Sequence, residues 1–480
     1  MAFVRKVKTK SGATAVQVAR KWRGKIVSLE HLGSAHSEEE LATLLALARQ
    51  RLAGDQLEFF TKPDSSLDFR IVRSYSGLLW KMLWEGYLRL GFDQLQDEVF
   101  AALCIARMVE PTSKLDSLRV LADLGVDRYD KNHLFRCLQR VVEKDYRVTL
   151  SQLCLRSRGH CRISLLLYDV TTLYFEVSQE DDYRKPGLSK ERRLEPQIIV
   201  GLLVDQVGFP LELTSFAGNT AETKTILPVI KGFRERYQVK QLTVVADAAM
   251  MSAGNLKELA AAGFNYIVGS RLQKVPYDIA EYQRSQPLTD GQLFVDHQPD
   301  HRIVYQYRAK RAALDIKNIE KQIAKAIRII AGRSPASRAK FVSVTAKTRR
   351  LNRDLIAKAY ALAGVKGYVT NLGIGNQRVI DYYHQLFQVE TSFRMTKSDL
   401  KARPIFHRKR DSIEAHLTVV FAALAMARDL EARAKISLKQ LVKTLGPIRS
   451  GVVSVNGKKY QAEPQISKEV QKLLKKLSGH

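Results

Sequence analysis

The chain has 480 residues, of which 45% are hydrophobic, and its formal net charge is +29. This length allows two or three domains with buried cores, and the strong positive charge favours a polyanionic partner, most often nucleic acid. No apolar run is long enough to cross a bilayer, and no apolar segment follows the N-terminal charges as in a signal peptide, which argues against a membrane protein.

Cysteine usage bears on the cellular compartment. None of the four cysteines, Cys104, Cys137, Cys154 and Cys161, forms a C-x-x-C pair, which argues against a zinc site. A reduced, cytoplasmic protein fits this pattern best.

The first 25 residues carry basic side chains and no acidic ones. Alternating residues on both sides of Gly24 predict a small hairpin, and Ser37 with Glu40 three residues later predicts a capped helix over Ser37–Leu52. A solvated basic arm and a DNA-contacting arm both remain open for this segment.

From Leu78 to about Leu155, apolar residues recur at helical spacing. The pattern predicts helices punctuated by Pro111 and Gly125; the clearest cover Phe92–Met108, Lys114–Leu124 and Lys131–Cys154. Short helices joined by tight turns are compatible with a helix-turn-helix reader of DNA, although any helical bundle gives a similar pattern. We predict a helical DNA-binding domain here.

The stretch ISLLLYDVTTLYFE, Ile163–Glu176, is an apolar run that suits a strand buried on both faces. Asp169 lies in its middle, where a carboxylate is costly to bury unless it is paired or binds a cation. A buried Asp bonded to the backbone or to Thr171 and a metal ligand are both compatible with this segment taken alone.

The elements that follow predict a mixed sheet. Gln197–Val204 and Pro210–Phe216 follow the first strand with no helix between them, which is typical of an antiparallel meander. Helix, strand, helix and strand come next, at Thr223–Tyr237, Gln241–Ala246, Ser252–Ala262 and Asn265–Val268. This order is that of a ribonuclease-H-like α/β core.

Residues 272–366 interrupt this pattern with strand-like pieces and a basic helix over Ala312–Ile330. A strand at Gly367–Asn371, a long helix over Asn376–Lys401 and an apolar helix over Asp411–Lys435 then return to the core pattern. The tail has a predicted hairpin at Val455-Asn456-Gly457 and a basic helix at Ser467–Leu477.

These elements divide the chain into six predicted parts. They are a basic N-terminal arm and helix (1–77), a helical DNA-binding domain (78–160), the first part of a ribonuclease-H-like core (161–271), a partly β insertion (272–366), the second part of the core (367–435) and a small α+β C-terminal tail (436–480).

A second carboxylate, Asp247, closes the strand QLTVVAD. In a ribonuclease-H-like sheet this strand neighbours the strand of Asp169, so both carboxylates can face one point, where a divalent cation would relieve their repulsion. A third candidate, Glu390, lies on the long predicted helix, where Tyr383, Glu390 and Lys397 recur every seven residues on one stripe. A structural ion pair of Glu390 with Arg394 remains an alternative.

Together these motifs resemble the DDE transposases of the bacterial insertion-sequence IS4 superfamily, more closely the IS1634-like group. The resemblance extends from Leu78 to about Leu430. That family has a D-V-T-T motif on the first strand, here beginning at Asp169, an aspartate after the fourth strand, here Asp247, and a large insertion before the glutamate. Its Y-x2-R-x3-E-x6-K signature matches Tyr383, Glu390 and Lys397, but Leu386 stands where the arginine is expected.

The resemblance implies a DNA transposase that binds the terminal inverted repeats of an insertion sequence, cleaves the ends and joins the 3′-hydroxyls to target DNA. Asp169, Asp247 and Glu390 are then the catalytic residues and the ligands of two Mg²⁺ ions, with Mn²⁺ as a substitute. The residues expected to contact DNA are Thr171, Thr172, Tyr383, Arg394 and Lys397.

The expected partners are double-stranded DNA, at transposon ends and target, and a second copy of the chain in a homodimer on DNA, with a cytoplasmic, nucleoid-associated location. A ribonuclease-H-like nuclease without strand transfer and a non-catalytic DNA-binding repressor are the alternative functions.

Overall fold

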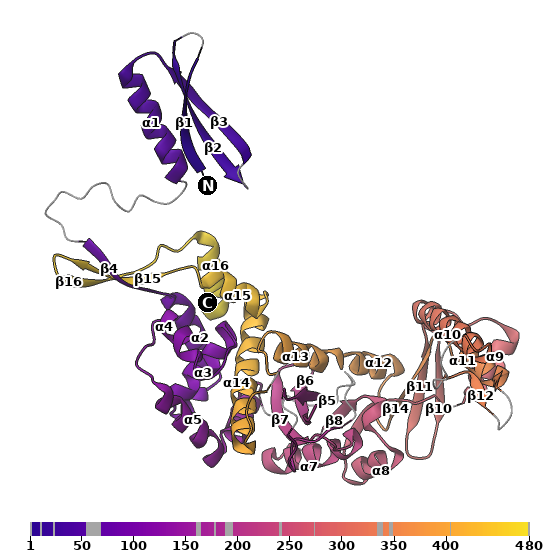
Figure 1. Cartoon of the computed structure of the whole chain (residues 1–480). Coiled ribbons are helices and arrows are strands. Elements are labelled where there is room, and N and C mark those ends of the chain that lie inside the picture. The colour runs from indigo at the N-terminus through magenta and orange to yellow at the C-terminus, as the bar shows by residue number, and fades with distance from the viewer. Residues whose placement is uncertain are drawn as a thin grey trace. The chain divides into compact units, whose positions relative to one another are not determined.

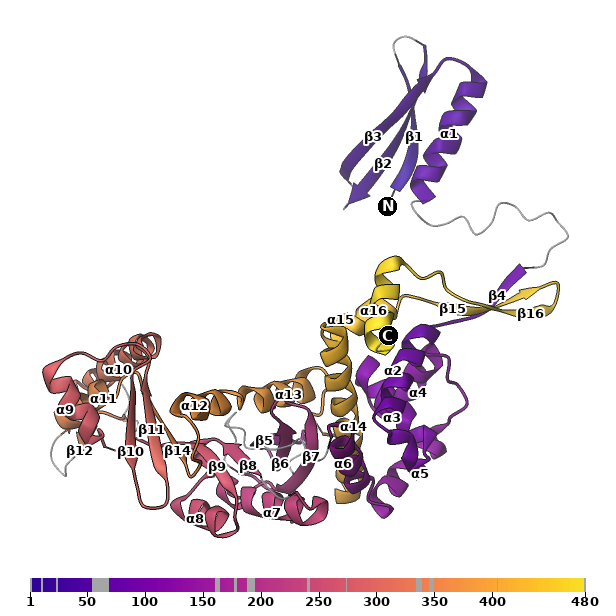
Figure 2. The same cartoon turned by 180° about the vertical axis from the view of Figure 1, so that it is seen from behind.

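The computed structural model describes residues 2–9, 12–22, 25–53, 69–159, 165–176, 179–187, 195–239, 242–272, 274–333, 339–344, 349–403 and 405–478. Contacts divide the chain into two units (Figures 1 and 2). One comprises Met1–Val72 and Val452–Gln461, the other Arg73–Gly451 and Ala462–His480. The predicted six-part division remains a prediction.

The N-terminal segment folds as a small α+β module. Strands β1 (Ala2–Lys8), β2 (Thr14–Trp22) and β3 (Lys25–Ala35) form an antiparallel sheet in that order, and helix α1 (Glu38–Ala53) packs on it. The predicted hairpin is therefore β2–β3, but β1, expected as part of a basic arm, adds a third strand. The Ser37 hydroxyl accepts from the Glu40 N–H at 3.1 Å, as predicted for the helix start.

A second small sheet joins distant parts of the sequence. Strands β4 (Phe69–Tyr75), β15 (Ser450–Val455) and β16 (Lys458–Ala462) lie in the order β16-β15-β4. The hairpin predicted at Asn456-Gly457 is confirmed, and both residues have positive φ (49° and 77°), as a tight turn between twisted strands requires.

The region from 77 to 157 is helical, as predicted, and it packs around a long helix from the other end of the chain, α14 (Arg410–Ala434). The helical elements are α2 (Gly77–Arg89), η1 (Phe92–Leu95), α3 (Glu98–Val109), α4 (Ser117–Asp123), α5 (Lys131–Glu143) and α6 (Tyr146–Ser157). The single helix expected at 131–154 is two helices, because the chain turns at Asp145, whose φ is 46°.

An eight-stranded mixed sheet forms the centre of the larger unit, in the order β10-β11-β14-β9-β8-β5-β6-β7. Its strands are β5 (Leu165–Tyr174), β6 (Gln197–Asp205), β7 (Pro210–Ala217), β8 (Thr243–Ala246), β9 (Asn265–Gly269), β10 (Leu293–His297), β11 (Arg302–Tyr307) and β14 (Val365–Thr370). Strands β5, β6 and β7 are antiparallel neighbours, whereas β8 and β9 run parallel to β5. This is the predicted ribonuclease-H-like order.

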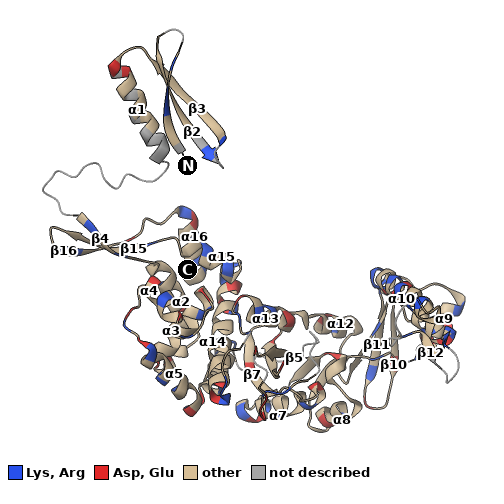
Figure 3. Cartoon of the chain, viewed as in Figure 1, with Lys and Arg blue, Asp and Glu red and all other residues tan. Residues whose placement is uncertain are grey.

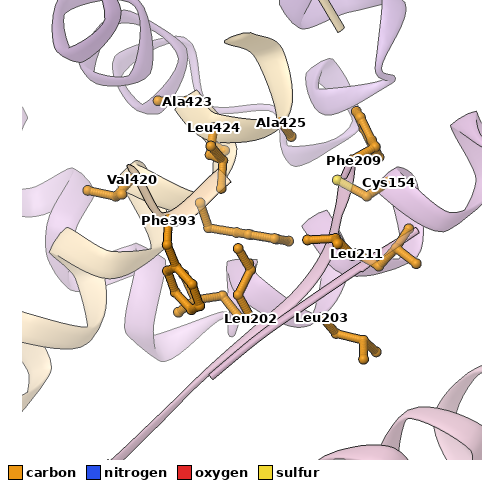
Figure 4. Packing of buried hydrophobic residues seen from close by; sticks show 14 of the residues in the cluster. Cys154, Leu202, Leu203, Phe209, Leu211, Phe393, Val420, Ala423, Leu424 and Ala425 are labelled. Carbon is orange, nitrogen blue, oxygen red and sulfur yellow. The ribbon is translucent and has the colours of Figure 1, made fainter. Parts of the chain in front are cut away.

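Helices cover both faces of this sheet. Figure 1 shows α7 (Ile226–Tyr237) and α8 (Ala253–Ala261) on one side, with α12 (Asn376–His384) and α13 (Phe387–Ser398) on the other. Phe393 of α13 and Leu424 of α14 pack with Leu202 of β6 in the core (Figure 4). This packing fixes the position of α13 on the sheet.

The segment 272–366 is partly β, as predicted, but its strands β10 and β11 extend the core sheet through β14 instead of forming a sheet of their own. Its other elements are α9 (Tyr277–Ser285), α10 (Ala309–Ile330), β12 (Val342–Val344), β13 (Arg349–Leu351) and α11 (Arg353–Ala361). Ile319, Ala326, Phe341 and Ala363 form a small separate core there.

The tail adds α15 (Leu438–Leu445) and α16 (Lys468–Ser478). Within the described residues, no helix is both long and apolar enough to span a membrane. Cys104, Cys137 and Cys154 are buried free thiols, and Cys161 lies outside the described residues.

Candidate active site

The two predicted aspartates lie on neighbouring parallel strands. Leu165, Leu166 and Leu167 of β5 pair with Thr243, Val244 and Val245 of β8. Continued along both strands, this register places Asp169 opposite Asp247, whose backbone is still extended (φ −75°, ψ 155°). Residues opposite each other in a sheet point to the same face, and the strands lie about 4.8 Å apart. The predicted proximity of the two strands is confirmed.

Asp247 is held at the point where β8 ends and η4 (Ala248–Met250) begins. One of its carboxylate oxygens, Oδ1, accepts from the Ala248 N–H at 2.7 Å and from the Tyr383 hydroxyl at 3.1 Å. Burial raises the pKa of Tyr383, and the negative charge of Asp247 raises it further. The hydroxyl therefore stays protonated and donates to Asp247.

The strand next to β8 leaves room for this tyrosine. A Cβ added at Gly269 of β9 would lie 2.8 Å from the Tyr383 hydroxyl oxygen. Any larger residue at this position would displace the hydroxyl that holds Asp247, which explains why glycine ends the strand here.

Tyr383 does not lie where a nucleotide could stack. Its side chain is only 5% exposed, and its ring packs edge-on against Tyr368 at 4.9 Å between centroids. The predicted packing of Tyr383 against the terminal nucleotide is therefore not supported by this structure, because helix α12 turns the ring into the core. Its observed contact is with Asp247.

Glu390 lies on a different helix from Tyr383. The single helix expected at 376–401 is broken, since α12 ends at His384 and α13 begins at Phe387. Glu390 is exposed in the first turn of α13, where the helix dipole favours a carboxylate. The stripe expected to run from Tyr383 to Lys397 is thus interrupted, and buried Leu386, the position of the expected arginine, lies in the break.

A lysine that sequence reasoning missed links these groups. The Lys366 ammonium, on β14, lies 4.3 Å from the centroid of the Tyr383 ring. Burial lowers the pKa of Lys366, and so does Arg311 of α10, whereas the carboxylates of Asp247 and Glu390 raise it. Both carboxylates therefore stabilise the charged form of Lys366. In the sequence, the only indication of Lys366 is that a lysine directly precedes the buried strand residues GYVT.

The three carboxylates offer hard oxygen donors, which suit Mg²⁺. Among the described residues, however, no group of three or more His, Cys, Asp or Glu side chains is arranged to hold a metal ion. The structure thus pairs the strand of Asp169 with the strand that ends at Asp247 but does not assemble the predicted triad as a metal centre among the described residues. Glu390 is carried by a separate helix.

Thr171 and Thr172, predicted to contact DNA, line a pocket of about 610 Å³ at the end of β5. Residues 218–223 and Ala249 form other parts of its wall. Thr171 is buried and Thr172 is partly exposed, and both line this pocket.

Arg394 and Lys397 lie on the face of α13 turned away from the sheet, where Arg394 is exposed and Lys397 partly exposed. Among the described residues Arg394 forms no ion pair with Glu390 or Asp399, the two partners that a surface role would offer. Basic residues are also frequent along α10 (Figure 3).

This strand order, with one aspartate in the middle of β5 and another directly after the adjacent parallel strand β8, defines a ribonuclease-H-like protein. The family described as the transposase DDE domain matches residues 160–426, more than half of the chain, and the chain belongs to this family. DDE transposases use divalent metal ions, generally Mg²⁺.

Among solved structures, the chain is similar to the piggyBac transposase in the cryo-EM structure of its synaptic complex with hairpin DNA. The two are 12% identical with a TM-score of 0.43, over 74% of this chain and 70% of that one. Comparison with curated proteins gives no match.

Proposed function

We propose that this DDE transposase belongs to the IS4 superfamily, in the IS1634-like group. It binds the terminal inverted repeats of an insertion sequence, cleaves the DNA ends and joins their 3′-hydroxyls to target DNA. The parallel pairing of β5 with β8 inside the matched domain, which when continued along both strands sets Asp169 opposite Asp247, supports the proposal. It is the arrangement that metal-dependent phosphoryl transfer needs, two carboxylates on rigid neighbouring strands.

In this proposal Asp169, Asp247 and Glu390 hold two Mg²⁺ ions, for which Mn²⁺ can substitute. Bound there, the ions would lower the pKa of the attacking water or 3′-hydroxyl and stabilise the leaving oxygen. Tyr383 orients Asp247 through its hydrogen bond. Asp169 and Asp247 come from β5 and the end of β8, whereas Glu390 comes from α13.

The positive charge around the site supports DNA as the substrate. Lys366 lies near Asp247 and Glu390, and Arg311 is close enough to lower the pKa of Lys366. Exposed Arg394 presents a forked donor suited to phosphate, and we propose that it and Lys397 contact a phosphate of the DNA end. Cleaving and joining two ends together would require two such sites, so we propose a homodimer on DNA.

Isosteric variants test this assignment. Asp169→Asn, Asp247→Asn and Glu390→Gln each remove one charged ligand while keeping the shape of the side chain. Each variant should lose cleavage of a duplex carrying the terminal repeat, with DNA binding close to that of the parent. A variant with parental cleavage would remove its residue from the site.

The same assay separates the alternatives. Detection of a product in which the cleaved 3′ end is joined to target DNA excludes a nuclease without strand transfer. Cleavage of any kind excludes a non-catalytic repressor. Inverted repeats flanking the reading frame would supply the substrate sequence for the assay.

A further inference from the structure

A group of four basic side chains, three of them buried and one partly buried, lies outside the candidate active site, between α3 and α14. Arg107 is in the last turn of α3, Lys114 follows in the next loop and His416 is on α14. His407 reaches them from the loop before α14, its ring centroid 5.4 Å from that of His416. We call these four residues the buried cationic cluster.

The contacts within the cluster define the state of its central histidine. His416 Nε2 lies 3.1 Å from the Ala402 carbonyl oxygen, and His416 Nδ1 lies 3.4 Å from Lys114 Nζ. Because a carbonyl can only accept, Nε2 carries the proton and Nδ1 accepts from Lys114. His416 is therefore neutral and supplies no negative charge to balance Lys114.

The chain provides no carboxylate for the two strongest cations. Arg107 and Lys114 are each only 7% exposed. Burial lowers the pKa of Lys114, Arg107 lowers it further, and the Cys104 and Cys137 thiols raise it. Burial also lowers the pKa of Arg107, and the Cys104 thiol raises it. In the described part of the chain neither cation forms an ion pair. The nearby carboxylate of Asp97 is bound to Arg140 at 2.7 Å.

Burying Arg107 and Lys114 without an anionic partner is strongly unfavourable. Burial accordingly lowers the pKa of Lys114 well below its ordinary value, and an anion bound beside it would counteract that shift. Burial lowers the pKa of Arg107 only to about 10, so this guanidinium stays charged at neutral pH. A structural role would be served at lower cost by apolar side chains or by one carboxylate. An anion from outside the chain would balance the charge.

The residues next to the buried cationic cluster indicate which kind of anion binds there. Arg408, Lys409 and Arg410 follow His407 directly and are all exposed, so the approach to the cluster is also positive. Next to them Phe406 is 72% exposed. An exposed aromatic side chain beside a run of bases is typical of surfaces that bind nucleic acid.

We propose that the buried cationic cluster binds one phosphate group and that this phosphate belongs to the DNA backbone. The loop that carries His407 begins where α13 ends, and its Ile405 pairs with Phe175 just beyond β5. A phosphate held there therefore anchors DNA beside the strand of Asp169. The assignment of this phosphate to DNA rests on the proposed function, whereas the existence of a phosphate site does not.

The first experiment measures thermal unfolding of the full-length protein in sodium phosphate and in sodium chloride at equal ionic strength and pH. The variants are Arg107→Met and Lys114→Met, with Lys231→Met as a control, a partly exposed lysine paired with Glu258. Replacing chloride by phosphate should raise the melting temperatures of the parent and the control. In phosphate both should melt at higher temperatures than the two cluster variants. In chloride the cluster variants should melt at or above the parent, because an unpaired buried charge is removed.

An equal phosphate effect on all four proteins would be a general salt effect and would overturn the site. The second experiment measures the salt dependence of binding to a short DNA duplex. Loss of one phosphate contact lowers the slope of log K against log salt concentration by about 0.9, which we expect for Lys114→Met and not for the control.

Lys114→Met could lose the rise in melting temperature in phosphate and still keep the parental slope of log K against log salt concentration. This result would assign the site to free phosphate and overturn the proposal that the phosphate belongs to DNA. Failure of every protein to bind the duplex would instead contradict the proposed function. The phosphate comparison would then still decide whether the site exists.

Discussion

The hydrogen bond from Tyr383 to Asp247 gives the most direct test of how the site is built. Tyr383→Phe removes the hydroxyl that donates to Asp247 at 3.1 Å and keeps the ring, which is buried against Tyr368. A hydrogen bond to a charged group contributes about 1.5–3 kcal/mol. Because Asp247 is itself exposed, we expect a value near the lower end, about 1–2 kcal/mol, or a factor of roughly 5–30.

This loss should appear in the use of metal ions. With Asp247 less well oriented, Tyr383→Phe should need roughly 5–30 times more Mg²⁺ than the parent for half-maximal cleavage. DNA binding without metal should not change. Burial and Asp247 raise the pKa of Tyr383 above its ordinary value of 10.0. The hydroxyl thus stays protonated below about pH 9, and the ratio of variant to parent should be constant there.

Tyr368→Phe is the matched control. Tyr368 is equally buried and belongs to the same ring pair, but its hydroxyl oxygen lies 3.5 Å from His384 Nε2 and not near a carboxylate. Its Mg²⁺ dependence should match the parent. If both variants shift the Mg²⁺ requirement equally, the effect comes from packing and the assigned role of Tyr383 is wrong.

Two further predictions concern DNA. Arg394→Ala should weaken binding of terminal DNA and slow cleavage, as should Lys397→Ala. If Arg394→Ala cleaves like the parent while Lys397→Ala is defective in cleavage, Arg394 is an ordinary surface residue. Deleting residues 1–53, a module with its own small core, should lower affinity for terminal DNA in a gel-shift titration, and undiminished affinity would show that recognition lies elsewhere. This deletion is a cleaner test than a fragment starting near residue 164, which would strip from α14 the helices that bury it.

The strand order of the core could be predicted because it is encoded locally. Three apolar runs without intervening helices can only pair with their neighbours, and the later helix–strand alternation implies parallel strands. The strand positions of Asp169 and Asp247 follow directly. Their exact register does not, because it depends on how β5 and β8 pair across more than seventy residues of sequence.

Lys366 could not be found in this way. It approaches Asp247 only because β14 pairs with β9, and the sequence between these strands folds into elements whose course no local pattern reveals. A lysine at the start of a buried strand usually indicates a strand end facing solvent. The role of β10 and β11 in extending the core sheet was missed for the same reason.

The break between α12 and α13 had no sequence signal either, since neither Gly nor Pro occurs at Gln385 or Leu386. Packing decides it, because α12 lies on β9 and β14 while α13 lies on β5 and β6. A single straight helix could not follow both pairs of strands across a twisted sheet. The break between α12 and α13 therefore separates the helix whose Tyr383 orients Asp247 from the helix that carries Glu390.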